Sequence, residues 1–168
     1  MQSGKHLIFA IGFRKMGTLS LHALFMSMGL KSSHGPYDTF KQKENFLNHD
    51  CFTDGEEHDF RLLHQTFPES KFILLDRNVD DWINSRVRFV QWCRYPYVIK
   101  IVNEYQRNPE QAVKDWKYRY HQYRSEVLDY FKGNILELNV CEDSPQKLYD
   151  YIGIRGEMKT FPHANKAA

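Results

Sequence analysis

The chain has 168 residues, 42% of them hydrophobic, which is enough to bury the core of one domain. Lysine and arginine total 23 against 21 aspartate and glutamate, so the formal charge of +2 is too small for a surface that binds nucleic acid through its phosphates. No apolar run approaches the roughly 18 residues of a membrane-spanning helix, and 9 glycines and 6 prolines are too few for a low-complexity chain. We therefore expect one domain, residues 1–168, that binds neither nucleic acid nor membrane.

The number and spacing of the cysteines bear on the cellular compartment of the protein. Cys51, Cys93 and Cys141 lie far apart and form no C-x-x-C pair, so neither a zinc site nor a redox motif is indicated. Because their number is odd and the N-terminal residues lack the apolar stretch of a secretory leader, we expect free structural thiols and a cytoplasmic location.

The first half of the chain begins with an apolar run at residues 6–11, a candidate for a buried strand. A helix is predicted from Thr18 to Met28, because four apolar residues there follow the i, i+3, i+4, i+7 spacing: Leu21, Leu24, Phe25 and Met28. Weaker strand candidates follow at 31–33 and 51–53, with a helix between them at 38–48. Glu56 and His58 are expected to open the next helix, where acidic residues suit the helix dipole.

The second half has a clearer strand at 71–76, followed by a helix for which Asn78 is the predicted cap. The longest helix is predicted from Pro109 to Lys132, and its regularly spaced apolar stripe indicates core packing. A last strand at 135–140 and a short helix after Ser144 complete the pattern. The alternation predicts an α/β fold, a single three-layer domain with about five parallel strands flanked by helices.

A glycine loop joins the first strand to the first helix. Gly12 and Gly17 are spaced as in a phosphate-binding loop, Lys15 places a cation inside it, and the hydroxyls of Thr18 and Ser20 can donate to anionic oxygens. The loop of nucleotide triphosphatases has lysine directly after its second glycine, where this chain has Thr18.

A second basic position follows the strand at 71–76. Arg77 would lie at the carboxyl end of a parallel strand, where α/β proteins bind ligands, and Ser85 follows eight residues later on the next helix. The alternative is that Arg77 forms an ion pair with Asp80 or Asp81.

Two segments resemble the sulfotransferase family, particularly its small bacterial-type members. Gly12-Phe-Arg-Lys-Met-Gly-Thr-Leu-Ser-Leu21 is similar to the family's G-x-P-K-[ST]-G-T-[TS]-S-L loop, and residues 67–85 are similar to its F-P-x-[AS]-K-F-I-L-x-x-R-[ND]-P-x-x-W-x-x-S segment. Residues 120–131, 135–140 and 161–165 resemble later family segments, so the similarity spans nearly the whole chain in the right order.

The resemblance implies a P-loop-like fold and a sulfotransferase that uses 3′-phosphoadenosine 5′-phosphosulfate (PAPS) and needs no metal. When the roles of the family's motif positions are transferred to the matching residues, Arg77 and Ser85 are expected to bind the 3′-phosphate, and the loop residues are expected to bind the 5′-phosphosulfate. These loop residues are Arg14, Lys15, Met16, Gly17, Thr18, Leu19 and Ser20. Arg14 replaces the family's proline, and Met16 and Leu19 replace hydroxyl residues, so these last two offer only their backbone N–H groups.

The resemblance also implies a catalytic lysine and a base. Lys15 would neutralise charge on the leaving oxygen, as in phosphoryl transfer. The family's base follows a central strand, a position that falls on Asp54 here, and His34 is the second catalytic candidate, ahead of Glu56 and His58. The acceptor is expected to be a small-molecule or partner-presented hydroxyl, or an amine.

Other interpretations stay open. The strand that ends at Asp76 resembles the magnesium-binding strand of a small ATP-dependent kinase, although the Gly-Lys-[Ser/Thr] sequence of such a kinase is missing. A non-catalytic nucleotide-binding homologue also stays open, because Met16 and Leu19 depart from the family's loop. Four aromatic residues after Ser85 form either a substrate wall or part of the core: Phe89, Trp92, Tyr95 and Tyr97.

Overall fold

A parallel sheet organises the protein. The computed structural model describes residues 6–34, 46, 48–54, 56, 59–93 and 95–162. Its strands are β1 (Ile8–Ile11), β2 (Ser32–Ser33), β3 (Cys51–Phe52), β4 (Lys71–Leu75) and β5 (Leu136–Leu138). They form a five-stranded sheet in the order β2-β3-β1-β4-β5, with every neighbouring pair parallel. The predicted α/β class and the strand number are confirmed.

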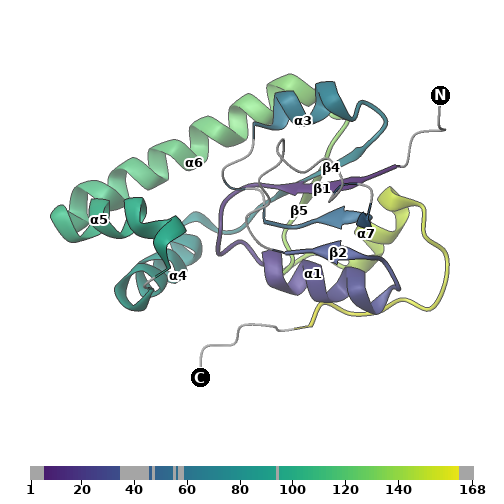
Figure 1. Ribbon diagram of the computed structural model, residues 1–168, viewed down its shortest axis with the longest axis horizontal. Coiled ribbons are helices and arrows are strands. Elements are labelled where there is room, and N and C mark those ends of the chain that lie inside the picture. The colour runs from purple at the N-terminus through teal and green to yellow at the C-terminus, as the bar shows by residue number, and fades with distance from the viewer. Residues whose placement is uncertain are drawn as a thin grey trace.

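Both faces of the sheet are covered by helices (Figure 1). Alternate strand residues such as Ala10 and Ile73 pack on the side of α1 (Thr18–Ser27) and α7 (Pro145–Ile152). Their neighbours Phe9 and Phe72 face α3 (Phe60–Thr66) and the C-terminal half of α6 (Pro109–Phe131). Because every residue of β1 is buried, its sequence is an unbroken apolar run, as is usual for a strand covered on both sides. The molecule therefore has the three predicted layers.

Most predicted helix ends are confirmed, because they depend on local capping chemistry. The Asn78 side chain accepts hydrogen bonds from the N–H groups of Asp80 and Asp81 at 3.0 and 3.2 Å and so begins α4 (Val79–Trp92). Asn108 caps α6 in the same way, and Ser144 caps α7. The stripe along α6 packs inward, as predicted, with Trp116 and Val127 at most 1% exposed.

Two parts of the helical pattern differ from the prediction. A 3₁₀ turn, η1 (Pro96–Val98), leads into α5 (Ile99–Arg107), which was not predicted from the sequence. Val98, Ile101, Val102 and Tyr105 follow the i, i+3, i+4, i+7 spacing of a helix and pack against the core; the Tyr105 ring stacks on Trp116 with centroids 5.8 Å apart. The expectation that Glu56 opens a helix is wrong, since α3 begins at Phe60 with Asp59 as its cap.

Parts of other predictions lie outside the described residues: most of the 38–48 helix, His58 and the end of the 161–165 segment. Among the helices that the structure describes, none is both long and apolar enough to cross a membrane.

Candidate functional site

The strand order places the candidate residues at one edge of the sheet. Strands β3, β1 and β4 are neighbours and run in the same direction, so the segments that leave their carboxyl ends lie side by side. These segments carry Asp54, the glycine loop and Arg77, respectively. Ligands of open α/β sheets bind at this edge.

The backbone of the glycine loop requires glycine at its end. Gly17 has a φ of 89°, and a Cβ there would overlap the Val140 side chain, which follows β5. Lys15 has a φ of 73°, which is unfavourable for a residue with a side chain. The loop is thus held in a specific conformation against the rest of the edge.

The end of this loop begins α1 and leaves its first amides available. Gly17 is the N-cap residue of α1, and no side chain in the described part of the chain caps this end. Uncapped N–H groups and the positive end of the helix dipole favour an anion. Thr18 is buried and Ser20 is half-buried in this first turn. Met16 is 1% exposed and packs in the core, which explains an apolar residue inside a polar loop.

Cations gather around Lys15. The Arg77 guanidinium donates a hydrogen bond to the Lys15 carbonyl oxygen at 3.0 Å, so Arg77 contacts the loop rather than Asp80 or Asp81. Burial lowers the pKa of the Lys15 ammonium, and the charges of Arg77 and Arg88 lower it further. Two arginine charges therefore act on Lys15, an arrangement that a bound anion would relieve.

By helical spacing, Ser85 shares a face of α4 with Phe89, whose ring lies beside Lys15. Phe89, one helical turn later, has its ring centroid 5.1 Å from the Lys15 Nζ. Arg88, which acts on the Lys15 charge, lies three residues after Ser85 and so on the same side of the helix. Sequence reasoning missed Arg88, although its spacing from Ser85 could have revealed it.

Arg14 takes a different direction from Lys15. Its guanidinium Nε lies 3.6 Å from Asp54 Oδ1, and its Nη1 lies 3.8 Å from Glu56 Oε2. The side chains of all three residues are only 9% exposed. In this structure the Arg14 side chain holds the glycine loop to the segment after β3, and its contribution to donor binding stays a prediction.

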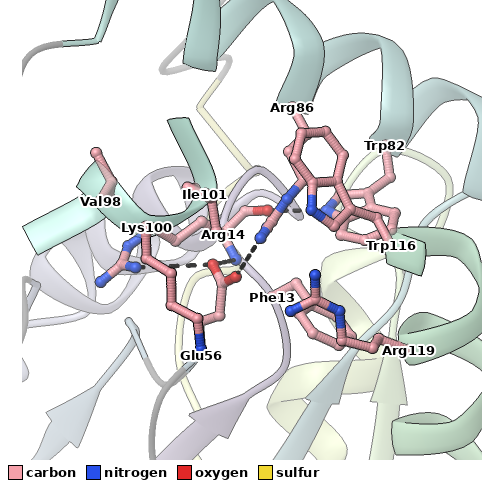
Figure 2. Close-up of a pocket in the computed structure, with 10 residues that line it drawn as sticks. All are labelled: Phe13, Arg14, Glu56, Trp82, Arg86, Val98, Lys100, Ile101, Trp116 and Arg119. Atoms are coloured by element: carbon pink, nitrogen blue, oxygen red, sulfur yellow. Dashed lines mark hydrogen bonds and ion pairs between the residues drawn. The ribbon is translucent and has the colours of Figure 1, made fainter. Parts of the chain in front are cut away.

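Glu56 connects the loop to α4. Its Oε2 accepts the Arg14 backbone N–H at 2.8 Å, and its Oε1 lies 2.7 Å from Arg86 Nη2 (Figure 2). The Trp82 indole donates to the Arg14 carbonyl at 2.9 Å, one turn before Arg86. Sequence reasoning missed Arg86 and Trp82, because nothing local shows that an arginine on this helix meets a carboxylate thirty residues earlier.

The two catalytic candidates Asp54 and His34 lie close together. His34 Nδ1 is 3.0 Å from the hydroxyl of Thr53, the residue before Asp54. The His34 residue is exposed, but its ring lies 5.5 Å from that of His22 and is partly desolvated. This desolvation lowers the pKa of His34, while Asp54 opposes the shift and His22 and Arg14 add to it.

Asp76 is not an open carboxylate. The Tyr120 hydroxyl donates to its Oδ1, the Arg77 N–H donates to the same oxygen at 2.8 Å, and Arg124 Nη1 lies 3.7 Å from Oδ2. Burial and the Asp76 charge raise the pKa of Tyr120, so this hydroxyl stays protonated. A kinase of the kind considered above would need Asp76 for magnesium. In the described part of the chain, no three acidic, histidine or cysteine side chains are grouped so that they could hold a metal ion.

The aromatic residues after Ser85 divide into two kinds: Phe89 is half-buried and packs against the core, whereas Trp92 and Tyr95 are exposed. Trp92 is 60% exposed and Tyr95 is 53% exposed. The Trp92 ring makes an edge contact with Phe89, with centroids 5.5 Å apart, so the group continues outward from the ring beside Lys15.

Comparison with known proteins agrees with this geometry. A search of curated proteins found no match. A family model described as the sulfotransferase family matches residues 55–140, about half of the chain. The matched region includes Arg77, Ser85 and the whole of α4, and the glycine loop that precedes it in sequence lies against it in the fold. On this match, the chain belongs to the sulfotransferase family.

Proposed function

We propose that the protein transfers a sulfuryl group from PAPS to a hydroxyl acceptor. The observation that carries the proposal is the convergence of Lys15, Arg77 and Arg88 beside the uncapped N-terminus of α1. Family membership supports sulfuryl transfer, and the charge arrangement supports a donor with several anionic groups.

The residues present fit such a donor. Lys15, Thr18 and Ser20, with the loop amides from Met16 to Leu19, would hold the 5′-phosphosulfate at the start of α1. Arg77 and Ser85 would hold the 3′-phosphate, and Arg88 lies on the Ser85 face of α4. The lowered pKa of Lys15 supports this assignment, because a bound anion would stabilise the ammonium against both burial and the repulsion from two arginines.

The chain's own side chains would supply positioning and proton transfer. When bound, the donor provides the sulfuryl group; the acceptor oxygen forms a bond to sulfur as the bond from sulfur to the phosphate oxygen breaks. Lys15 would oppose the negative charge that grows on the leaving oxygen. Asp54 would take the acceptor's proton, with His34 beside it as the alternative base.

Neither alternative gains support from the site. The carboxylate that a kinase would use is engaged by the Tyr120 hydroxyl, the Arg77 backbone N–H and the Arg124 guanidinium. A non-catalytic homologue would bind the same donor, so turnover distinguishes it. The cytoplasmic location and the small-molecule or partner-presented acceptor stay predictions.

Thermal unfolding with adenosine 3′,5′-bisphosphate, the product of the donor, tests the proposal. The bisphosphate without magnesium should raise the melting temperature, because a ligand at about 100 times its Kd stabilises the folded state by about 2.7 kcal/mol. Lys15→Ala and Arg77→Ala should weaken this effect. Lys15→Ala should also stabilise the ligand-free protein, since it removes a partly buried cation from beside two others.

Lys114→Ala, which removes an exposed cation of α6, is the matched control and should leave the ligand effect unchanged. Stabilisation by ATP with magnesium, together with none by the bisphosphate, would contradict the proposal.

A further inference from the structure

A second feature of this edge is a cavity of about 400 Å³ between the glycine loop and the helices α4, α5 and α6. Phe13 lines it from the loop, Trp82 from α4 and Trp116 from α6, so flat apolar surfaces form much of its wall (Figure 2). Its volume suits a small molecule. Its lining includes Phe13 and Arg14, the two residues before Lys15, but neither Lys15 nor Arg77, so the cavity adjoins the proposed phosphate site without including it.

The charge of the lining is one-sided. Arg14, Arg86, Lys100 and Arg119 contribute four cations, and Glu56 is the one carboxylate among the lining residues. Glu56 is already committed to Arg14 and Arg86. Arg119 bonds to Glu104 at 2.9 Å outside the lining. Arg14 also pairs with Asp54, so the four cations face three carboxylates in all, and the surroundings of the cavity keep a small positive excess that favours an anion.

Arg86 has donors that the fold leaves unused. Its side chain is 3% exposed, and Nη2 bonds to Glu56, but Nε and Nη1 have no hydrogen-bond partner within the described part of the chain. The guanidinium carbon lies 5.3 Å from the Trp82 ring centroid and 4.9 Å from that of Trp116. A buried guanidinium with unmatched N–H groups is costly to the fold, and a carboxylate is the group that fits it.

The cavity also lies beside the proposed base. Arg14, which lines it, has its Nε 3.6 Å from Asp54 Oδ1, and Glu56 follows Asp54 by two residues. A ligand held here by one end can present its other end toward Asp54.

We infer that this cavity is the acceptor site and that its acceptor is a hydroxylated aromatic carboxylate. The carboxylate is received by Arg86 with support from Lys100 and Arg119, and the ring packs among Phe13, Trp82 and Trp116. The assignment as acceptor rests on the proposed sulfuryl transfer; the binding of the carboxylate does not.

Calorimetry with 3-(4-hydroxyphenyl)propanoate and with its uncharged amide, both without donor, tests the inference. The two compounds share ring and hydroxyl and differ in the charge that Arg86 would recognise. The carboxylate should bind about ten-fold more tightly or better, the factor expected for a charge-assisted hydrogen bond. Arg86→Lys, which keeps a cation for Glu56 but removes the two free donors, should abolish most of this preference.

Lys100→Gln, at an exposed residue, should reduce the preference several-fold even if Arg86→Lys fails to fold, and Lys114→Gln should leave it unchanged. Equal affinities for carboxylate and amide, or no binding of either compound, would overturn the inference while leaving bisphosphate binding intact. Conversely, tight binding of the carboxylate without sulfuryl transfer from PAPS would count against the proposed function and leave the carboxylate site standing.

Discussion

Removing the charge of Glu56 should destabilise the fold far more than removing a surface carboxylate. Glu56 Oε1 lies 2.7 Å from Arg86 Nη2, and the two side chains are 9% and 3% exposed. Glu56→Gln retains the size of the side chain but leaves Arg86 without its ion-pair partner. Breaking a buried pair by removing one partner costs about 3–5 kcal/mol, because the remaining charge stays out of water. This is a large part of the roughly 5–15 kcal/mol that stabilises an ordinary domain.

Urea unfolding followed by tryptophan fluorescence measures this loss directly. The double variant Glu56→Gln with Arg86→Met should be more stable than the sum of the single effects, since no buried charge is then left alone. Glu110→Ala is the control: its partner Lys114 is also 2.7 Å away, but the two side chains are 80% and 65% exposed, so the loss should stay below about 1 kcal/mol. A loss of less than about 1 kcal/mol for Glu56→Gln would refute the argument that this pair is buried and tightly coupled.

Two further predictions concern the loop and the histidine pair. Gly17→Ala should lower the melting temperature more than Gly133→Ala. Both glycines have a φ of 89°, but only at Gly17 would the new Cβ meet another side chain, that of Val140. Equal decreases in melting temperature would contradict this close contact. The pKa of His34 and of His22 is lowered from 6.5, so the unfolded chain binds protons that the folded protein does not. The stability of the fold should therefore decrease as the pH drops from 6.5 through the lowered pKa values. In melting curves recorded across this pH range, His34→Gln should make the melting temperature depend less on pH. An unchanged dependence would show that His34 does not titrate in this way.

Local chemistry explains why much of the fold could be predicted. An asparagine that bonds to amides two and three residues ahead acts through neighbours in the chain, so Asn78 and Asn108 marked the starts of α4 and α6 correctly. The apolar run of β1 and the two glycines of the loop after it lie within about ten residues, so a buried strand and a glycine loop could also be predicted from neighbours in the chain. Helix α5 was missed although Val98, Ile101, Val102 and Tyr105 follow the same i, i+3, i+4, i+7 spacing that predicted the helix after Thr18, so its sequence did carry the signal.

The sequence alone therefore determined the α/β class, the order of the central elements, the family, and the expectation that Lys15 and Arg77 belong to one phosphate-binding edge. Only the tertiary structure decided how the charges at that edge are divided. Lys15 and Arg77 contact each other, whereas Arg14 turns to Asp54 and Glu56, and Glu56 in turn reaches Arg86. These partners lie 30 to 62 residues apart in the chain. Their pairing depends on which strands are neighbours and on how α4 packs across the sheet edge. The spacing of residues that are close in the sequence predicts neither the strand order nor this packing.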